Sequence, residues 1–169
     1  MGYQFKLSGH LFEKNFNEKK KMKEYEQLVI RKTFNHPREL VFQAWSQPGH
    51  ISNWLFPDSN CPVKVEAFNF TVGGNYRFAF HGPEQVDFVS GNYQIIDPPR
   101  KLEFTWTWQK PTQDAGIPTI VTIELSEDDN STELLLTQKA FGSIEMCNRH
   151  KLGWEGAIHF LESHLAKNS

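Results

Sequence analysis

Closely spaced strand patterns fill the middle of the chain, and their spacing limits the possible folds more than any other feature of the sequence. The segments 63–70, 75–81, 86–96, 102–109, 118–126 and 132–139 are bounded by turn-forming Gly, Pro, Asn and Asp residues. Turns this short join antiparallel neighbours, because parallel strands need a crossover of a dozen or more residues. With an earlier strand over 26–34, the pattern predicts an antiparallel sheet of six to seven strands.

The strand over 102–109 indicates which face of the sheet is buried. Its large apolar residues are Leu102, Phe104, Trp106 and Trp108, and they alternate with Glu103, Thr105, Thr107 and Gln109. Successive side chains of a strand point to opposite faces, so the four apolar groups share one face. We expect a second layer of structure to cover that face.

The last segment changes the period of its apolar residues from two to 3.6. Its helical stripe consists of Cys147, His150, Trp154, Ala157, Ile158, Leu161 and Leu165. We expect one long C-terminal helix that lays this stripe on the apolar face of the sheet. Gly153 and Gly156 each cost such a helix about 1 kcal/mol relative to Ala, a cost that close approach to the sheet or a bend beside Trp154 would explain.

The N-terminal part of the chain divides into an extension and the start of the domain. Pro37 suits a first helical turn, and the apolar spacing after it predicts a helix over 37–46, with a short helical turn over 50–54. Residues 1–24 form an extension. Its first residues alternate in a way that favours a strand, and its next apolar residues favour a helix, so the sequence leaves the two open. A Lys-rich run that follows is typical of a solvated tail. The domain is expected to cover 25–169, and Met22 is a candidate natural start.

Composition excludes several classes of function. A formal net charge of -2 and a pI of about 6.4 give no electrostatic attraction to a phosphate backbone, so no nucleic-acid partner is expected. No apolar run approaches the roughly 18 residues of a membrane span, and no signal-peptide core is present, so no membrane association is expected. Cys61 and Cys147 are too few for a disulfide framework, which fits reduced thiols in the cytoplasm.

Motifs for catalysis, metals and cofactors are absent from the sequence. It contains no Gly-x-Ser-x-Gly, Gly-x-x-x-x-Gly-Lys or Gly-x-Gly-x-x-Gly pattern. His159 and His164 are five residues apart rather than the four that place two zinc ligands on one helix face. The acid and base candidates, which form no recognisable pair, are Arg149, His150, Asp87 and Glu66. We therefore expect no metal and no cofactor, and we assign no catalytic residue.

A set of short motifs, taken in order, resembles one protein family. The motifs are the strand-to-helix segment 34–45, Trp54, Gly73-Gly74-Asn75-Tyr76-Arg77-Phe78, Gly91-Asn92-Tyr93, Pro98-Pro99-Arg100-Lys101-Leu102, Phe104-Thr105-Trp106, Thr132-Glu133-Leu134 and Gly153-Trp154. Over residues 26–166 they resemble the activator of heat-shock-protein-90 ATPase homologue group of the START-like, or SRPBCC, superfamily. The chain departs from that pattern at residues 54–57, where many relatives have paired tryptophans and a Gly-Pro, and at Gln138, where many have His.

The resemblance implies an α+β helix-grip fold, in which a curved antiparallel sheet wraps around a long C-terminal helix and leaves a cavity between them. The residues expected around this cavity are Trp45, Trp54, Phe56, Tyr76, Phe78, Phe80, Phe104, Trp106, Trp108, Leu136, Gln138, His150, Trp154 and Ile158. The 5 Trp, 4 Tyr and 14 Phe of the chain supply most of that wall. Such a wall suits a flat apolar ligand, and the alternative is that the rings simply fill the interior.

Three functions are compatible with these features. The first is binding of a small apolar, aromatic or lipid-like molecule, which we favour because the aromatic residues converge on one sheet face and one helix stripe. The second, implied by the family name, is regulation of a chaperone through a protein interaction. The third is a cavity enzyme of cyclase or hydrolase type. The sequence leaves open whether the protein is a monomer or a homodimer.

Overall fold

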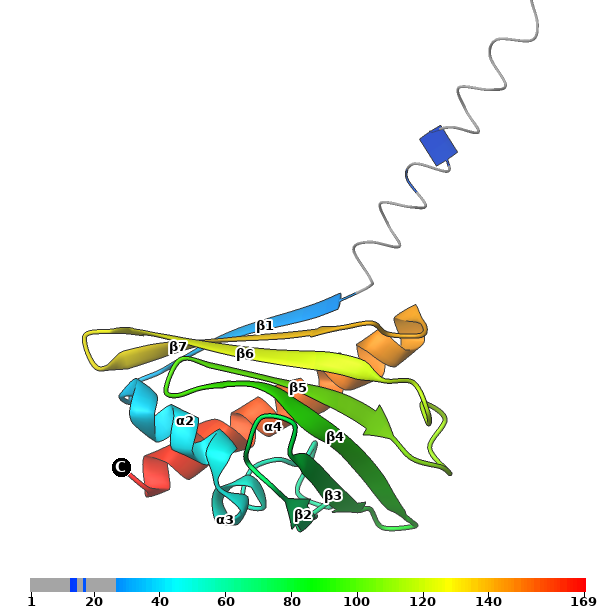
Figure 1. The fold of residues 1–169 in the computed structure, drawn as a ribbon, viewed down its shortest axis with the longest axis horizontal. Helices are drawn as coiled ribbons and strands as arrows, with labels where there is room; N and C mark the ends of the chain where they lie inside the picture. Colours follow the sequence, from blue (N-terminus) through cyan, green and yellow to red (C-terminus); the bar gives the residue numbers. More distant parts are fainter. Residues whose placement is uncertain (1–12, 15–16, 18–26) are drawn as a thin grey trace, which may run out of the picture.

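Seven strands of the computed structural model form one antiparallel sheet in the order β1-β7-β6-β5-β4-β3-β2 (Figure 1). Their bounds are β1 Gln27–Phe34, β2 Val63–Phe68, β3 Asn75–His81, β4 Val86–Asp97, β5 Lys101–Trp108, β6 Thr119–Asp128 and β7 Ser131–Lys139. The structure describes residues 13–14, 17 and 27–169. The predicted extension over 1–24 therefore lies almost wholly outside the described residues, as does Met22.

Within residues 27–169, three helices complete the fold: α2 (Arg38–Ser46), α3 (Pro48–Ile51) and α4 (Ile144–Lys167). The long helix α4 lies along one face of the sheet, and α2 and α3 lie near its C-terminal end (Figure 1). The predicted antiparallel sheet, paired short helices and long C-terminal helix are thus confirmed, and together they form the helix-grip fold.

Two interruptions in strand pairing accompany the curvature of the sheet. The register between β4 and β5 shifts between Tyr93 and Ile95, and that between β2 and β3 shifts between Val65 and Ala67. An extra residue in one strand of an antiparallel pair bends the strand and increases its local twist. The bends let the β2–β5 side of the sheet curl toward α4.

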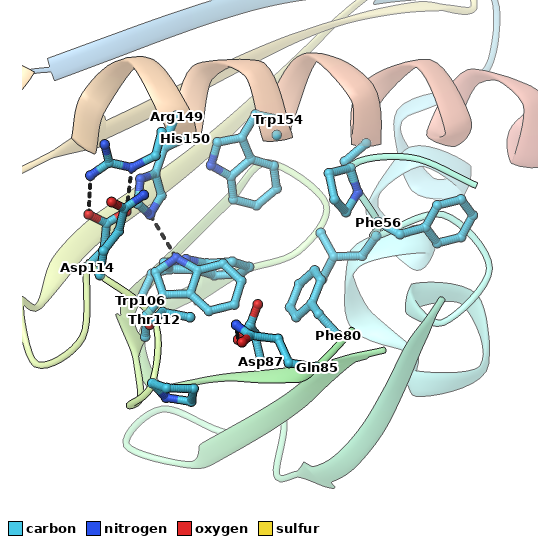
Figure 2. Close-up of a pocket in the computed structure, with 17 residues that line it drawn as sticks. Phe56, Phe80, Gln85, Asp87, Trp106, Thr112, Asp114, Arg149, His150 and Trp154 are labelled. Atoms are coloured by element: carbon cyan, nitrogen blue, oxygen red, sulfur yellow. Dashed lines mark hydrogen bonds and ion pairs between the residues drawn. The ribbon is translucent and has the colours of Figure 1, made fainter. Parts of the chain in front are cut away.

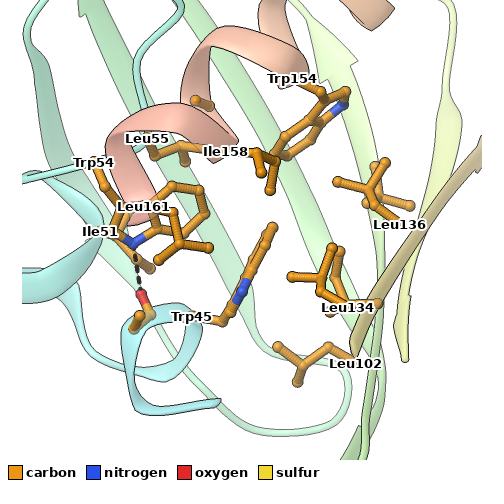
Figure 3. Close-up of a cluster of buried hydrophobic side chains, with 14 of the residues drawn as sticks. Trp45, Ile51, Trp54, Leu55, Leu102, Leu134, Leu136, Trp154, Ile158 and Leu161 are labelled. Carbon is orange, nitrogen blue, oxygen red and sulfur yellow. Dashed lines mark hydrogen bonds between the residues drawn. The ribbon is translucent and has the colours of Figure 1, made fainter. Parts of the chain in front are cut away.

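The hydrophobic core lies between α4, α2 and the inner face of the sheet (Figure 3). Trp45 of α2 is its centre: its ring centroid lies 4.6 Å from that of Trp54 and 5.9 Å from that of Trp154. Trp54 is fully buried and donates its indole N–H to the Ala44 carbonyl at 2.9 Å. Because each large ring buries roughly 150–250 Å², these tryptophans account for much of the apolar surface that holds α2 against the sheet and α4.

The two glycines of α4 have different surroundings. A Cβ at Gly156 would lie 2.1 Å from the Pro57 carbonyl oxygen, so this glycine lets α4 pass close to the loop after α3. The close approach is therefore to that loop and not to the sheet. At Gly153, by contrast, a Cβ would meet nothing within 4 Å.

These surroundings predict opposite effects for the same substitution. Gly156→Ala should lower the free energy of unfolding by about 1–3 kcal/mol, because backbone must move to admit the methyl group. Gly153→Ala should raise it by up to about 1 kcal/mol through helix propensity. Urea unfolding of the two variants beside the wild type measures both effects, and equal changes of the same sign would contradict the prediction.

Candidate functional site

A pocket of about 470 Å³ lies between the N-terminal half of α4 and the β3–β5 part of the sheet (Figure 2). Its lining residues are Leu55, Phe56, Pro57, Phe80, Gln85, Asp87, Trp106, Trp108, Pro111, Thr112, Gln113, Asp114, Arg149, His150, Gly153, Trp154 and Ala157. They come from the loop after α3, from three strands, from the β5–β6 connection and from one face of α4. The pocket is therefore a product of the whole fold rather than of one local motif.

Aromatic side chains form much of the pocket wall. Trp106 and Trp108 are two residues apart on β5, so strand alternation places both on the inner face of the sheet, with their ring centroids 5.7 Å apart at 85°. Phe80 of β3 lies 5.0 Å from Trp108, and Trp154 of α4 lies 5.2 Å from Trp106, centroid to centroid. The rings therefore surround the space from both the sheet and the helix.

His150 is a buried titratable residue in the wall, and both of its ring nitrogens are engaged. Its Nε2 accepts a hydrogen bond from Trp108 Nε1 at 2.9 Å, and its Nδ1 lies 2.8 Å from the Met146 carbonyl oxygen. The carbonyl can only accept, so the Nδ1–H donates to it and the ring is neutral. Burial is the main cause that lowers the pKa of His150, and the nearby Arg149 lowers it further, against opposing effects of the Met146 carbonyl and Asp114.

Gln138 belongs to a chain of buried hydrogen bonds behind the pocket. It accepts from Trp154 Nε1 at 2.7 Å and donates from Nε2 to Thr119 Oγ1 at 2.8 Å. Thr119 in turn donates to the Trp106 carbonyl at 2.8 Å. Fully satisfied networks of this kind hold buried side chains in one orientation. Gln138 therefore fixes the Trp154 ring that forms the pocket wall.

An ion pair holds the β5–β6 connection against α4. Arg149 donates to both carboxylate oxygens of Asp114, with Nε 3.1 Å from Oδ2. Asp114 is buried, and this side-chain hydrogen bond is the main cause that raises the pKa of Arg149. A two-bond guanidinium–carboxylate pair is geometrically specific. It therefore sets where the loop over 109–118 borders the pocket.

The predicted site residues fall into two groups in the structure. Those that line the 470 Å³ pocket are Phe56, Phe80, Trp106, Trp108, His150 and Trp154. The others, Trp45, Trp54, Tyr76, Phe78, Phe104, Leu136, Gln138 and Ile158, are buried away from that pocket. Several of this second group, with Trp106 and Trp154, surround a separate space of only about 20 Å³. In that region the rings fill the interior, as the alternative reading of the sequence proposed.

Sequence reasoning did not place several other residues in the lining. Pro111, Thr112, Gln113 and Asp114 belong to a loop without periodicity, so no pattern could assign them to a face. Asp87 and Arg149 were noted only as charged candidates. The one available signal was the parity of Asp87 with Val89 on β4, which places Asp87 on the inner face.

The remaining polar candidates lie outside the pocket. Glu66 pairs with Arg77 at 3.2 Å. His164 Nε2 lies 2.7 Å from His50 Nδ1. Desolvation is the main cause that lowers the pKa of His164, and the nearby His50 and Lys167 lower it further. No group of three His, Cys, Asp or Glu side chains that could hold a metal ion occurs among the described residues.

Fold and pocket together define a START-like helix-grip protein with an aromatic-walled pocket beside α4. A family model described as Activator of Hsp90 ATPase homolog 1-like protein matches residues 35–166, and the chain belongs to that family. No curated protein matches the chain at the significance required. In residues 13–14, 17 and 27–169, no helix is both long and apolar enough to span a membrane.

Solved structures share this fold. The AHSA1 protein of Silicibacter pomeroyi is 26% identical, with a TM-score of 0.73 over 85% of this chain and 99% of the other. A protein of Chromobacterium violaceum is 23% identical, with a TM-score of 0.74 over 83% and 96%. A protein of Arthrobacter aurescens is 23% identical, with a TM-score of 0.75 over 85% and 88%. The shared architecture thus covers nearly the entire length of these relatives.

The neutral state of His150 predicts a pH dependence of stability. Its folded pKa lies below the ordinary value of 6.5, so as the pH falls below about 6.5 the unfolded chain gains a proton that the folded chain resists. Stability should then fall by up to about 1.4 kcal/mol per pH unit from this group. Urea unfolding at several pH values between 7.5 and 5 gives the free energy of unfolding as a function of pH. This free energy should fall less steeply with falling pH for His150→Gln than for the wild type. The same dependence on pH in both proteins would contradict a lowered pKa for His150. His164 contributes equally to both proteins, so it does not affect the comparison.

The Gln138 network predicts non-additive substitutions. Gln138→Leu leaves the buried Trp154 N–H without a partner and should cost about 1–3 kcal/mol of unfolding free energy. Adding Trp154→Phe removes that stranded donor, so the double variant should lose less than the sum of the two single losses. Chemical denaturation of the three variants measures the coupling, and strict additivity would show that the hydrogen bond does not stabilise the fold.

Proposed function

We propose that this protein binds a small, flat, apolar molecule in the pocket between the sheet and α4. The observation that carries the proposal is a pocket of about 470 Å³ walled by Trp106, Trp108 and Trp154. Small-molecule pockets commonly measure about 300–1,000 Å³ and combine apolar walls with a few polar groups. The size and lining of this pocket support a ligand with one or two fused rings.

The engagement of His150 and Arg149, two of the acid and base candidates in the pocket, favours binding over catalysis. A general base needs a lone pair within reach of the substrate, yet the acceptor nitrogen of His150 already receives the Trp108 N–H. Arg149 is likewise held by Asp114. These side chains keep the wall in shape, which is the role expected in a preformed binding pocket.

Position 153 offers a way to close the pocket without disturbing the core. Gly153 lines the pocket and shares one face of α4 with Arg149 and Ala157, at spacings of four residues. A Cβ there meets nothing within 4 Å, so Gly153→Leu places its side chain in free pocket volume. Gly153→Ala is the matched control, because it adds the same backbone effect with little bulk.

Titration with 1-methylnaphthalene tests the proposal. Calorimetry and tryptophan fluorescence should show saturable one-site binding to the wild type and to Gly153→Ala, because three indole rings border the ligand. Gly153→Leu should weaken binding at least tenfold while remaining folded by circular dichroism. Absence of saturable binding by wild type, together with an unchanged melting temperature at saturating ligand, would overturn the proposed function.

A further inference from the structure

We propose that the pocket selects an aromatic organic cation, such as a heteroaromatic ring with a positively charged nitrogen. This inference rests on the proposed function and specifies the charge of the ligand. It follows from one carboxylate and from the rings beside it.

Asp87 brings a carboxylate into the aromatic part of the pocket. It lies on β4 directly opposite Phe80 of β3, and opposed residues of an antiparallel pair project from the same face. Both residues line the pocket, and Asp87 is only partly exposed (Figure 2). A charged oxygen therefore borders the space that a ring would occupy.

Among residues 27–169, no cation forms an ion pair with Asp87. Gln85 Nε2 donates to one carboxylate oxygen at 2.6 Å. A carboxylate partly removed from water interacts strongly with an opposite charge placed next to it. A cationic ligand would supply the counter-charge that the described residues do not.

The other charged groups of the pocket do not offset this carboxylate. Arg149 is paired through two hydrogen bonds with Asp114, and His150 is neutral. The lining thus contains two carboxylates and one guanidinium, which leaves one net negative charge at Asp87. An anionic ligand would face this charge and would have to break the Arg149–Asp114 pair to gain a partner.

A neighbouring thiol experiences the same negative field. Burial is the main cause that raises the pKa of Cys61, and Asp58 and Asp87 raise it further. The charge of Asp87 therefore acts on groups beyond its own hydrogen-bond partner. This end of the pocket favours positive charge.

The aromatic wall adds a second attraction for a cation. The faces of indole and phenyl rings carry partial negative charge, and a cation over such a face gains roughly 0.5–2 kcal/mol, depending on its solvation. Phe80 and Trp108, with centroids 5.0 Å apart, lie on the same wall as Asp87. A flat cation can therefore stack on a ring while its charge lies near the carboxylate.

A pair of probes of equal shape tests the inference. 1-Methylquinolinium and 1-methylnaphthalene differ by one ring atom, a charged nitrogen in place of carbon. Calorimetry should give the cation at least fivefold higher affinity for the wild type, and Asp87→Asn should lower cation affinity about tenfold while leaving the neutral probe unchanged. Glu84→Gln, which removes an exposed carboxylate of the adjoining hairpin turn, is the control and should leave both affinities unchanged.

The outcomes separate this inference from the proposed function. Suppose that the neutral probe binds at least as tightly as the cation and that Asp87→Asn has no effect. These results would overturn the cation preference and leave the pocket as an apolar binding site. Failure of both probes to bind would overturn the proposed function itself. If Asp87→Asn does not fold, the salt dependence of binding to the wild type provides the test. The affinity for the cation should fall several-fold between 20 and 500 mM NaCl. An affinity that does not fall would overturn the inference.

Discussion

The packing of α4 across the inner face of the sheet determines both the core and the pocket. In the C-terminal half of the helix, Ile158, Leu161 and Leu165 are almost fully buried and fill the space against the sheet. Nearer the middle of the helix, Gly153 and Ala157 occupy the face toward the pocket. Small side chains leave open the volume that larger ones fill further along, so one helix on one sheet face produces a solid core and a cavity side by side.

Keeping this cavity open requires that its walls do not collapse inward. Trp154, like Trp106, borders both the pocket and the tightly packed core. The N–H bond of Trp154 to Gln138, itself bonded to Thr119, prevents such an inward movement. Trp108 is held in the same way by His150. The polar partners of Trp154 and Trp108 thus orient these two rings, because rotation of either ring would leave its N–H donor unpaired.

The sequence predicted the frame of this protein far better than its pocket. Strands and the long helix follow from residues that repeat with a period of two or 3.6, and those periods state which side chains share a face. These periods alone assign Trp106, Trp108 and Trp154 to the interior. Periodicity does not say how much of that interior is filled, which is why Trp45 and Tyr76 were grouped with the pocket residues although they surround the tightly packed part.

The charged groups of the pocket are brought into place by contacts between elements that lie apart in the sequence. The contact between Asp114 and Arg149 joins positions 35 residues apart, through a loop whose course depends on the finished fold. The chain has 20 acidic side chains, and the sequence does not single out Asp87 among them. Its pairing opposite Phe80 is what places it beside the rings. Relatives at 23–26% identity keep the sheet and helix, because many apolar sets satisfy the same packing. A single charge at the pocket wall can change without disturbing that packing, so the charge of the pocket can differ between proteins that share the fold.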